Sequence, residues 1–126
     1  MLFRSKSFRR ILNFGHTIGH ALELLSNYTL SHGRSIAIGM CAEAEMSVSL
    51  GLLPRTSSER LRNLVASYGL PTAIPIKIDR SDIIRATLSD KKANNGSIRY
   101  TLLNHIGKGR VDVRLRPDEV RRMILR

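Results

Sequence analysis

The sequence predicts a mainly α-helical domain that carries one small β-hairpin. Three observations support this fold class. Apolar residues recur at helical spacing in most of the chain, residues that commonly begin or end helices bound those segments, and one stretch near the C-terminus is typical of two short strands joined by glycines. With 126 residues, the chain is expected to form one domain around a modest core.

The first fifty residues are expected to form two helices joined by a short polar break. The first helix is entered at Phe8 after a serine cap, and residues 26–28 end it after Leu25. The second follows a cap at Ser31 and ends at Gly51. Its buried side is expected to consist of Ile36, Met40, Met46, Val48 and Leu50, with small residues between them.

The remainder is expected to contain two short helices, the hairpin and a last helix. The third and fourth helices are predicted over Glu59–Ser67 and Asp82–Asp90, the latter capped by Asp79 or Ser81. The apolar face of the third is expected to consist of Leu61, Leu64 and Val65. The later elements are predicted as strands Ile98–Ile106 and Arg110–Leu115, joined through residues 107–109, and a helix from Pro117 to Leu125.

The net charge of +11 indicates an anionic partner, such as nucleic acid, a phosphorylated metabolite or an acidic surface. Aromatic residues are only 5% of the chain, which does not suit stacking on single-stranded nucleic acid, so a small phosphorylated ligand is ranked first. We expect neither a transmembrane helix nor a secretory signal from this sequence. The single Cys41 excludes an internal disulfide, so a cytoplasmic location is expected, and this residue is expected to pack rather than react.

Three of the four histidines, His16, His20 and His32, lie within seventeen positions. On a helix the first two share one face, and the polar break before His32 can turn the chain back toward them. Imidazole suits zinc and titrates near neutral pH, so the cluster could bind a metal, an anion or a proton. Gly15 and Gly19 would let a backbone or a ligand come close to these rings.

The ordinary alternative is that each histidine is bonded to backbone or water on a helical core. We favour a site because three lie together, although a zinc site would still be one or two ligands short. Glu23 lies seven residues after His16, on roughly the same helix face, and could support the histidines or pair with a basic residue. His105 is expected in a strand, where the ordinary interpretation is stronger.

Basic and polar residues beside the cluster could bind phosphate. Arg9 and Asn13 are four residues apart on the predicted helix face that leads into His16, where they could contact a phosphate and a hydroxyl. Lys91 and Lys92 lie in a polar loop and could clamp a phosphate or a carboxylate, although most lysine pairs are simply solvated.

Two stretches of the chain resemble a known family, the 3-dehydroquinate synthases, which are sugar phosphate cyclases. Leu-Asn-Phe-Gly-His-Thr-Ile-Gly-His-Ala-Leu-Glu at residues 12–23, then His32-Gly33 and residues 37–40, resemble its C-terminal domain. Asp90-Lys91-Lys92, Gly96, Arg99, residues 102–103 and residues 106–108 resemble a later signature in the right order. The resemblance implies that residues 1–126 form the helical C-terminal domain, with the N-terminal NAD-binding domain absent from this chain.

The resemblance also implies an activity. In this family a divalent metal, zinc or cobalt, and NAD act on DAHP, a phosphorylated seven-carbon sugar acid. A ring hydroxyl is oxidised transiently, phosphate is eliminated, the ketone is reduced again, and ring opening with aldol closure gives 3-dehydroquinate. The reaction belongs to the shikimate pathway of aromatic amino-acid biosynthesis.

Carried over by position, the resemblance implies that His16 and His32 are metal ligands and that His20 is the catalytic histidine. The third ligand, a carboxylate, would lie in the N-terminal domain. The substrate-binding positions implied are Arg9, Asn13, Lys91 and Lys92. We therefore expect no turnover by the chain alone. The expected partners are the substrate, an NAD-binding domain or complementing chain, and a second copy in a homodimer of the full enzyme.

The chain departs from the family at several positions. His-Gly-Glu-Ala is usual where this chain has His-Gly-Arg34-Ser35, so a cation stands two residues from a metal ligand and would weaken metal binding if it pointed inward. Ser5 stands where an acidic residue is usual. The absent domain leads us to expect a fragment, a truncated gene product or one half of a split enzyme.

Three other functions stay open. Another sugar phosphate cyclase would use the same scaffold on a different heptulose phosphate, because fold-level kinship does not fix the substrate. A glycerol-type metal-dependent dehydrogenase would share the architecture, but its unphosphorylated substrate needs no clamp such as Lys91 and Lys92. A basic nucleic-acid-binding module would bind with an affinity that falls steeply with salt and ignores mutation of His16.

Overall fold

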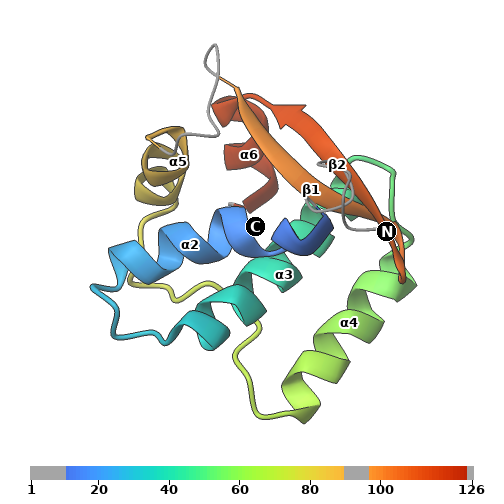
Figure 1. Ribbon diagram of the computed structural model, residues 1–126, viewed down its shortest axis with the longest axis horizontal. Coiled ribbons are helices and arrows are strands. Elements are labelled where there is room, and N and C mark those ends of the chain that lie inside the picture. Colours follow the sequence, from blue (N-terminus) through green and yellow to red (C-terminus); the bar gives the residue numbers. More distant parts are fainter. Residues whose placement is uncertain (1–10, 90–96, 125–126) are drawn as a thin grey trace, which may run out of the picture.

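The computed structural model describes residues 11–89 and 97–124, which form a set of packed helices with one small sheet at one side (Figure 1). The elements are the 3-10 helix η2 (Ile11–Asn13), α2 (His16–Leu25), α3 (His32–Ser49), α4 (Arg55–Ser67), α5 (Arg80–Leu88), β1 (Ile98–His105), β2 (Lys108–Leu115) and α6 (Pro117–Ile124). The predicted mainly α-helical class with one small hairpin is confirmed. Within the described ranges, no helix combines the length and apolar composition needed to cross a bilayer.

Helix α3 is the centre of the fold, and it contacts α2, α4, β1 and α6 (Figure 1). It begins at a Ser31 cap, whose Oγ accepts a hydrogen bond from the backbone N–H of Arg34 at 3.3 Å. Leu50 closes it, and Gly51 follows with a φ of 75°, a conformation that favours glycine. Both ends agree with the sequence prediction.

Helices α2 and α3 cross with their backbones in direct contact. A Cβ atom added at Gly39 would lie 2.0 Å from the carbonyl oxygen of Gly15 and 2.7 Å from the backbone nitrogen of Gly19. Only glycine allows so close an approach. The expectation that small residues beside His16 admit another backbone is confirmed, and the contact sets the first turn of α2 against the middle of α3.

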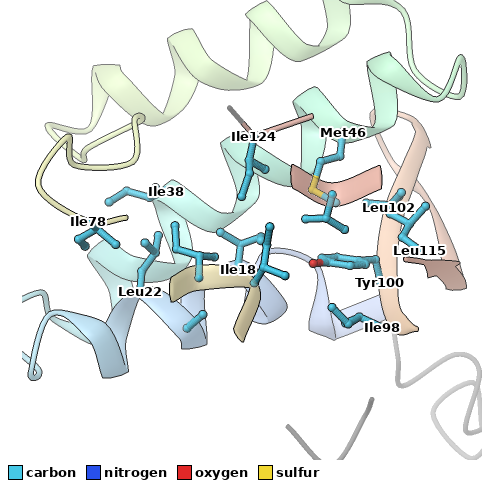
Figure 2. Packing of buried hydrophobic residues seen from close by; sticks show 14 residues of the cluster. Ile18, Leu22, Ile38, Met46, Ile78, Ile98, Tyr100, Leu102, Leu115 and Ile124 are labelled. Carbon is cyan, nitrogen blue, oxygen red and sulfur yellow. The ribbon is translucent and has the colours of Figure 1, made fainter. Parts of the chain in front are cut away.

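The main core fills the space between these two helices, the hairpin, α5 and α6 (Figure 2). Ile18 and Leu22 come from α2, and the buried ring of Tyr100 comes from β1. Ile83 of α5 and Val120 of α6 have no exposed surface. Each fully buried apolar side chain of this size contributes about 1.5–3 kcal/mol, so this one cluster supplies most of the driving force for folding.

The predicted buried faces of two helices need correction. Met46 is fully enclosed, but Leu50 is 36% exposed, and most enclosed positions of α3 are small ones such as Ala37 and Ala44. In α4, Val65 is buried, whereas Leu64 is 56% exposed. The reason is that α3 is the main neighbour of α4 among the described elements, so chiefly the side of α4 that faces that helix is covered. Helix α4 also begins earlier than predicted, at Arg55 after Pro54.

The C-terminal elements close the other side of the core. Asp79 caps α5 by accepting a hydrogen bond from the backbone N–H of Ser81 at 2.8 Å. Strands β1 and β2 pair antiparallel from Ile98 opposite Leu115 to His105 opposite Lys108. The predicted three-residue connection was too long, since Lys108 and Gly109 already belong to β2 and the chain reverses over residues 106–107.

Candidate metal centre

The start of α2 is held by a buried carboxylate from α3. Glu43 has no exposed surface, and its Oε1 and Oε2 accept hydrogen bonds from the backbone N–H groups of Gly15 at 2.8 Å and Ile18 at 3.0 Å. The first N–H groups of a helix have no partner within the helix, and the positive end of the helix dipole favours an anion there. Glu43 therefore fixes the backbone on both sides of His16.

This arrangement corrects one sequence prediction. A single helix was expected to carry Asn13 and His16 on one face, but η2 ends at Asn13 and a turn precedes α2. Gly15 has a φ of 85°, a left-handed conformation that cannot continue a right-handed helix. Asn13 is partly buried in η2. Its position relative to His16 is set by the turn at residues 14–15 rather than by helical periodicity.

His16 and His32 are the first residues of α2 and α3, and their rings lie together. The ring centroids are 5.8 Å apart and the ring planes are inclined at 62°. The Nδ1 of His16 lies 3.3 Å from the carbonyl oxygen of Phe14, and the Nδ1 of His32 lies 3.0 Å from Oε1 of Glu23. Both oxygens can only accept, so a neutral ring that hydrogen-bonds to either one carries its proton on Nδ1 and keeps the lone pair on Nε2.

These two rings fit a shared divalent cation. Zinc lies about 2.0–2.1 Å from an imidazole nitrogen, so two rings on one tetrahedral ion have centroids roughly 5–6 Å apart, a range that includes the observed separation. Metal-bound histidines commonly donate their second N–H to a carboxylate or a carbonyl, as both rings do here. Within residues 11–89 and 97–124, no group of three or more His, Cys, Asp or Glu side chains could hold a metal ion.

His20 lies on the same helix as His16, and its side chain is 54% exposed. Its Nδ1 is 3.9 Å from Oε1 of Glu23, the same oxygen that His32 contacts at the shorter distance. The side chain of Glu23 is 16% exposed. The sequence left two roles open for Glu23, support of the histidines or a pairing with a basic residue. The structure places its carboxylate between two of the three clustered histidines.

The remaining predicted site residues, Arg9, Lys91 and Lys92, lie outside the described residues. The departures from the family at residues 34 and 35 are both described. The side chain of Arg34 is exposed, while the hydroxyl of Ser35 is fully buried and has no hydrogen-bond partner within the described part of the chain.

Cys41 is buried against α4 in a small cluster with Ala37 and Val65. Burial raises the pKa of the Cys41 thiol, and the nearby charge of Arg62 opposes that rise only in part. A buried thiol with a raised pKa is a poor nucleophile, which agrees with the packing role predicted for it.

Sequence reasoning missed Glu43, although one signal was present. An acidic residue stands among the small and apolar residues of a helix that was expected to be enclosed on most sides. A buried carboxylate must find donors, so its presence there indicates backbone N–H groups or a cation within reach. Which donors those are depends on the crossing of α2 over α3.

Comparison with known proteins gives one consistent family. Residues 3–93 match the model of the 3-dehydroquinate synthase C-terminal domain. The 3-dehydroquinate synthase of Dehalococcoides mccartyi is 47% identical over 114 residues, 90% of this chain and 32% of that protein. The synthase of Thermodesulfovibrio yellowstonii is 38% identical over 122 residues, 96% of this chain and 34% of that protein. The chain thus spans about a third of the length of these curated relatives.

Solved structures agree with this assignment. A 2-deoxy-scyllo-inosose synthase, crystallised with carbaglucose-6-phosphate, NAD+ and Co2+, matches with a TM-score of 0.78 at 27% identity, over 89% of this chain and 33% of that chain. The fold is also that of a 2-epi-5-epi-valiolone synthase from Streptomyces hygroscopicus with NAD+ and Zn2+ bound, with a TM-score of 0.80 at 22% identity, over 98% of this chain and 34% of that chain. The chain belongs to the 3-dehydroquinate synthase family and corresponds to its C-terminal domain.

Proposed function

We propose that this chain supplies the metal- and substrate-binding part of a 3-dehydroquinate synthase, which converts DAHP to 3-dehydroquinate with elimination of phosphate. The observation that carries the proposal is the pairing of His16 and His32, whose rings lie 5.8 Å apart with both Nδ1 atoms engaged. Membership of the synthase family supports the reaction class.

Each residue then has a definite task. His16 and His32 hold a zinc or cobalt ion through Nε2, and the ion, when bound, supplies a Lewis acid beside the substrate oxygens. His20 exposes its imidazole beside this pair and moves a proton at the substrate. The phosphate and hydroxyls of the substrate are bound by Arg9, Asn13, Lys91 and Lys92, with Lys92 favoured over its neighbour.

The proposal requires a nucleotide-binding domain as a partner. The relatives are about three times as long as this chain, and the inosose synthase was crystallised with NAD+. We propose that NAD and the carboxylate that completes the metal site come from such a domain, on the same polypeptide or on a second one, and that the complete enzyme is a homodimer. The 126-residue chain by itself would then be inactive.

Metal binding tests the site directly. Co2+ is added to the purified chain together with the separately produced remainder of the Dehalococcoides mccartyi synthase, which supplies the carboxylate ligand. It is expected to produce the visible absorption of an imidazole-bound ion, and His16→Ala or His32→Ala should abolish it. His105→Ala is the matched control, because this histidine is exposed at the end of β1 and bonds to the Ile106 carbonyl. Equal loss in all three variants, or none in any, would contradict the metal centre.

Activity tests the reaction. The chain is mixed with the separately produced remainder of the Dehalococcoides mccartyi synthase, NAD and Co2+, and phosphate release and 3-dehydroquinate are measured with DAHP. We expect activity only when both parts are present, and its loss in His20→Ala. Turnover by the chain alone with NAD would refute the domain assignment. Turnover of a different sugar phosphate in place of DAHP would favour another cyclase, as the likeness to the inosose synthase allows.

A further inference from the structure

Glu23 occupies a position that the proposed function does not use. It belongs to α2, yet its carboxylate reaches the first residue of α3, where Oε1 lies 3.0 Å from Nδ1 of His32. The carboxylate is largely enclosed, with 16% of the side chain exposed, whereas the ring of His32 is 61% exposed. An exposed ring on the first turn of a helix has little packing to hold it, so this contact is what fixes its orientation.

The loop between the two helices is anchored on the same residue. The carbonyl oxygen of Glu23 accepts hydrogen bonds from the backbone N–H of Tyr28 and from Oγ of Ser26, both at 3.0 Å. Asn27 and Tyr28 adopt φ values of 55° and 62°, which are costly for residues with a side chain. This tight reversal brings the chain back, so that His32 at the start of α3 contacts the carboxylate of Glu23 in α2.

We propose that Glu23 is a positioning residue for the metal centre: it holds His32 in the Nδ1–H tautomer and turns Nε2 toward the ring of His16. This inference rests on the proposed function only in one respect, namely that the group bound by His16 and His32 is a metal ion. The carboxylate can accept but not donate, so it selects the tautomer whose proton is on Nδ1. A ring without this partner is free to place its proton on Nε2, the atom that a cation needs unprotonated.

His20 provides an internal comparison. Its Nδ1 is 3.9 Å from the same carboxylate oxygen, which is beyond hydrogen-bonding distance. Glu23 therefore fixes the tautomer of His32 and not that of His20. The Nδ1 of His16 is held by the Phe14 carbonyl instead, so its tautomer should not depend on Glu23 either.

The first test uses the metal-free chain and long-range 1H–15N correlation of the histidine rings, at a pH well above the usual imidazole pKa. In the unmodified chain, His32 is expected as the Nδ1–H form. Glu23→Ala should shift it largely to the Nε2–H form, while Glu23→Gln, which keeps an acceptor oxygen, should retain most of the Nδ1–H form. Glu59→Ala removes a charge from the exposed side of α4 and should change nothing.

The second test measures Co2+ affinity in the same variants, each mixed with the remainder of the synthase so that the metal site is complete. Loss of such a supporting carboxylate typically weakens metal binding about 10–100-fold, so Glu23→Ala should fall in that range and Glu23→Gln should lie between it and the unmodified chain. An Nε2–H form of His32 in the unmodified chain, or no tautomer change in Glu23→Ala, would overturn the inference. Absence of Co2+ binding when the unmodified chain and the remainder of the synthase are both present would instead overturn the proposed function, with the tautomer result still standing.

Discussion

Two carboxylates support the histidines of this protein, and they do so in different ways. Glu43 is fully buried and binds backbone N–H groups on both sides of His16, at the crossing of α2 and α3. Glu23 and His32 lie at the more exposed edge of the site, which we call the rim, and there Glu23 binds a side chain, the ring of His32. The buried contacts fix the relative positions of α2 and α3, whereas the contact at the rim fixes the orientation of a ring. Changes at the crossing should therefore cost stability, whereas changes at the rim should cost ligand binding.

The largest effect is expected from Gly39→Ala. The new Cβ would lie 2.0 Å from the Gly15 carbonyl oxygen, a backbone atom that can move only if α2 moves. Overpacking of this kind costs about 3 kcal/mol or more, measured as the free energy of unfolding in urea. Gly33→Ala is the control, since it lies in the same helix and its new Cβ would have no described atom of another part of the fold within 4 Å. It should be neutral or stabilising by up to about 1 kcal/mol. Equal changes in the free energy of unfolding for the two variants would contradict the special role of the α2–α3 crossing.

Glu43→Gln should come next. The amide keeps one acceptor oxygen but presents an N–H group to one of the two backbone donors, Gly15 or Ile18, at a fully buried position. Loss of a charged hydrogen bond with a buried donor left unpaired costs about 2–3 kcal/mol. Urea unfolding would measure it, with Glu23→Gln as the comparison at the rim. A larger loss of stability in Glu23→Gln would reverse the roles assigned to the two carboxylates.

Ser35→Ala should act in the opposite direction. The Ser35 hydroxyl is fully buried at the crossing and has no hydrogen-bond partner within the described residues. Replacing an unsatisfied buried hydroxyl by hydrogen, with a residue of higher helix propensity, should raise the free energy of unfolding by about 1 kcal/mol. Thermal unfolding would show a higher midpoint than in the unmodified chain. A lower midpoint would mean that the hydroxyl has a partner in solution.

A third carboxylate, that of Glu45 on α3, gives the smallest effect and a pH dependence. Burial opposes its ionisation, but hydrogen bonds from Ser58 and Arg55, with the charges of Arg55 and Arg62, outweigh burial and lower the pKa of Glu45. The folded-state pKa is below the unfolded one, so this network stabilises above the unfolded-state pKa and is lost as the pH falls through the folded-state pKa.

Comparison of the unmodified chain with Glu45→Gln in urea, from neutral to acidic pH, checks this sign. The difference should be at most about 1 kcal/mol at neutral pH, because the carboxylate is partly exposed, and it should vanish in acid. A difference that stays constant across the series would show that charge is not its source.

Much of the fold could be predicted because its signals are local. Ser31 and Asp79 cap helices where the sequence places them, and Pro117 begins the last helix. The clustering of His16, His20 and His32 was also visible from spacing. The exposure of Leu64 was not, since periodicity shows that a helix has an apolar face but not whether a second neighbour covers its edge.

The sequence by itself determined which residues form helices and that three imidazoles lie near one another along the chain. Only the tertiary structure decided that Gly15 breaks the first helix, that Glu43 reaches back to hold the break, and that Glu23 turns the His32 ring. The physical reason is one of distance along the chain. Caps and periodicity act between residues a few positions apart, whereas these contacts join residues 9 to 28 positions apart and exist only once α2 lies against α3.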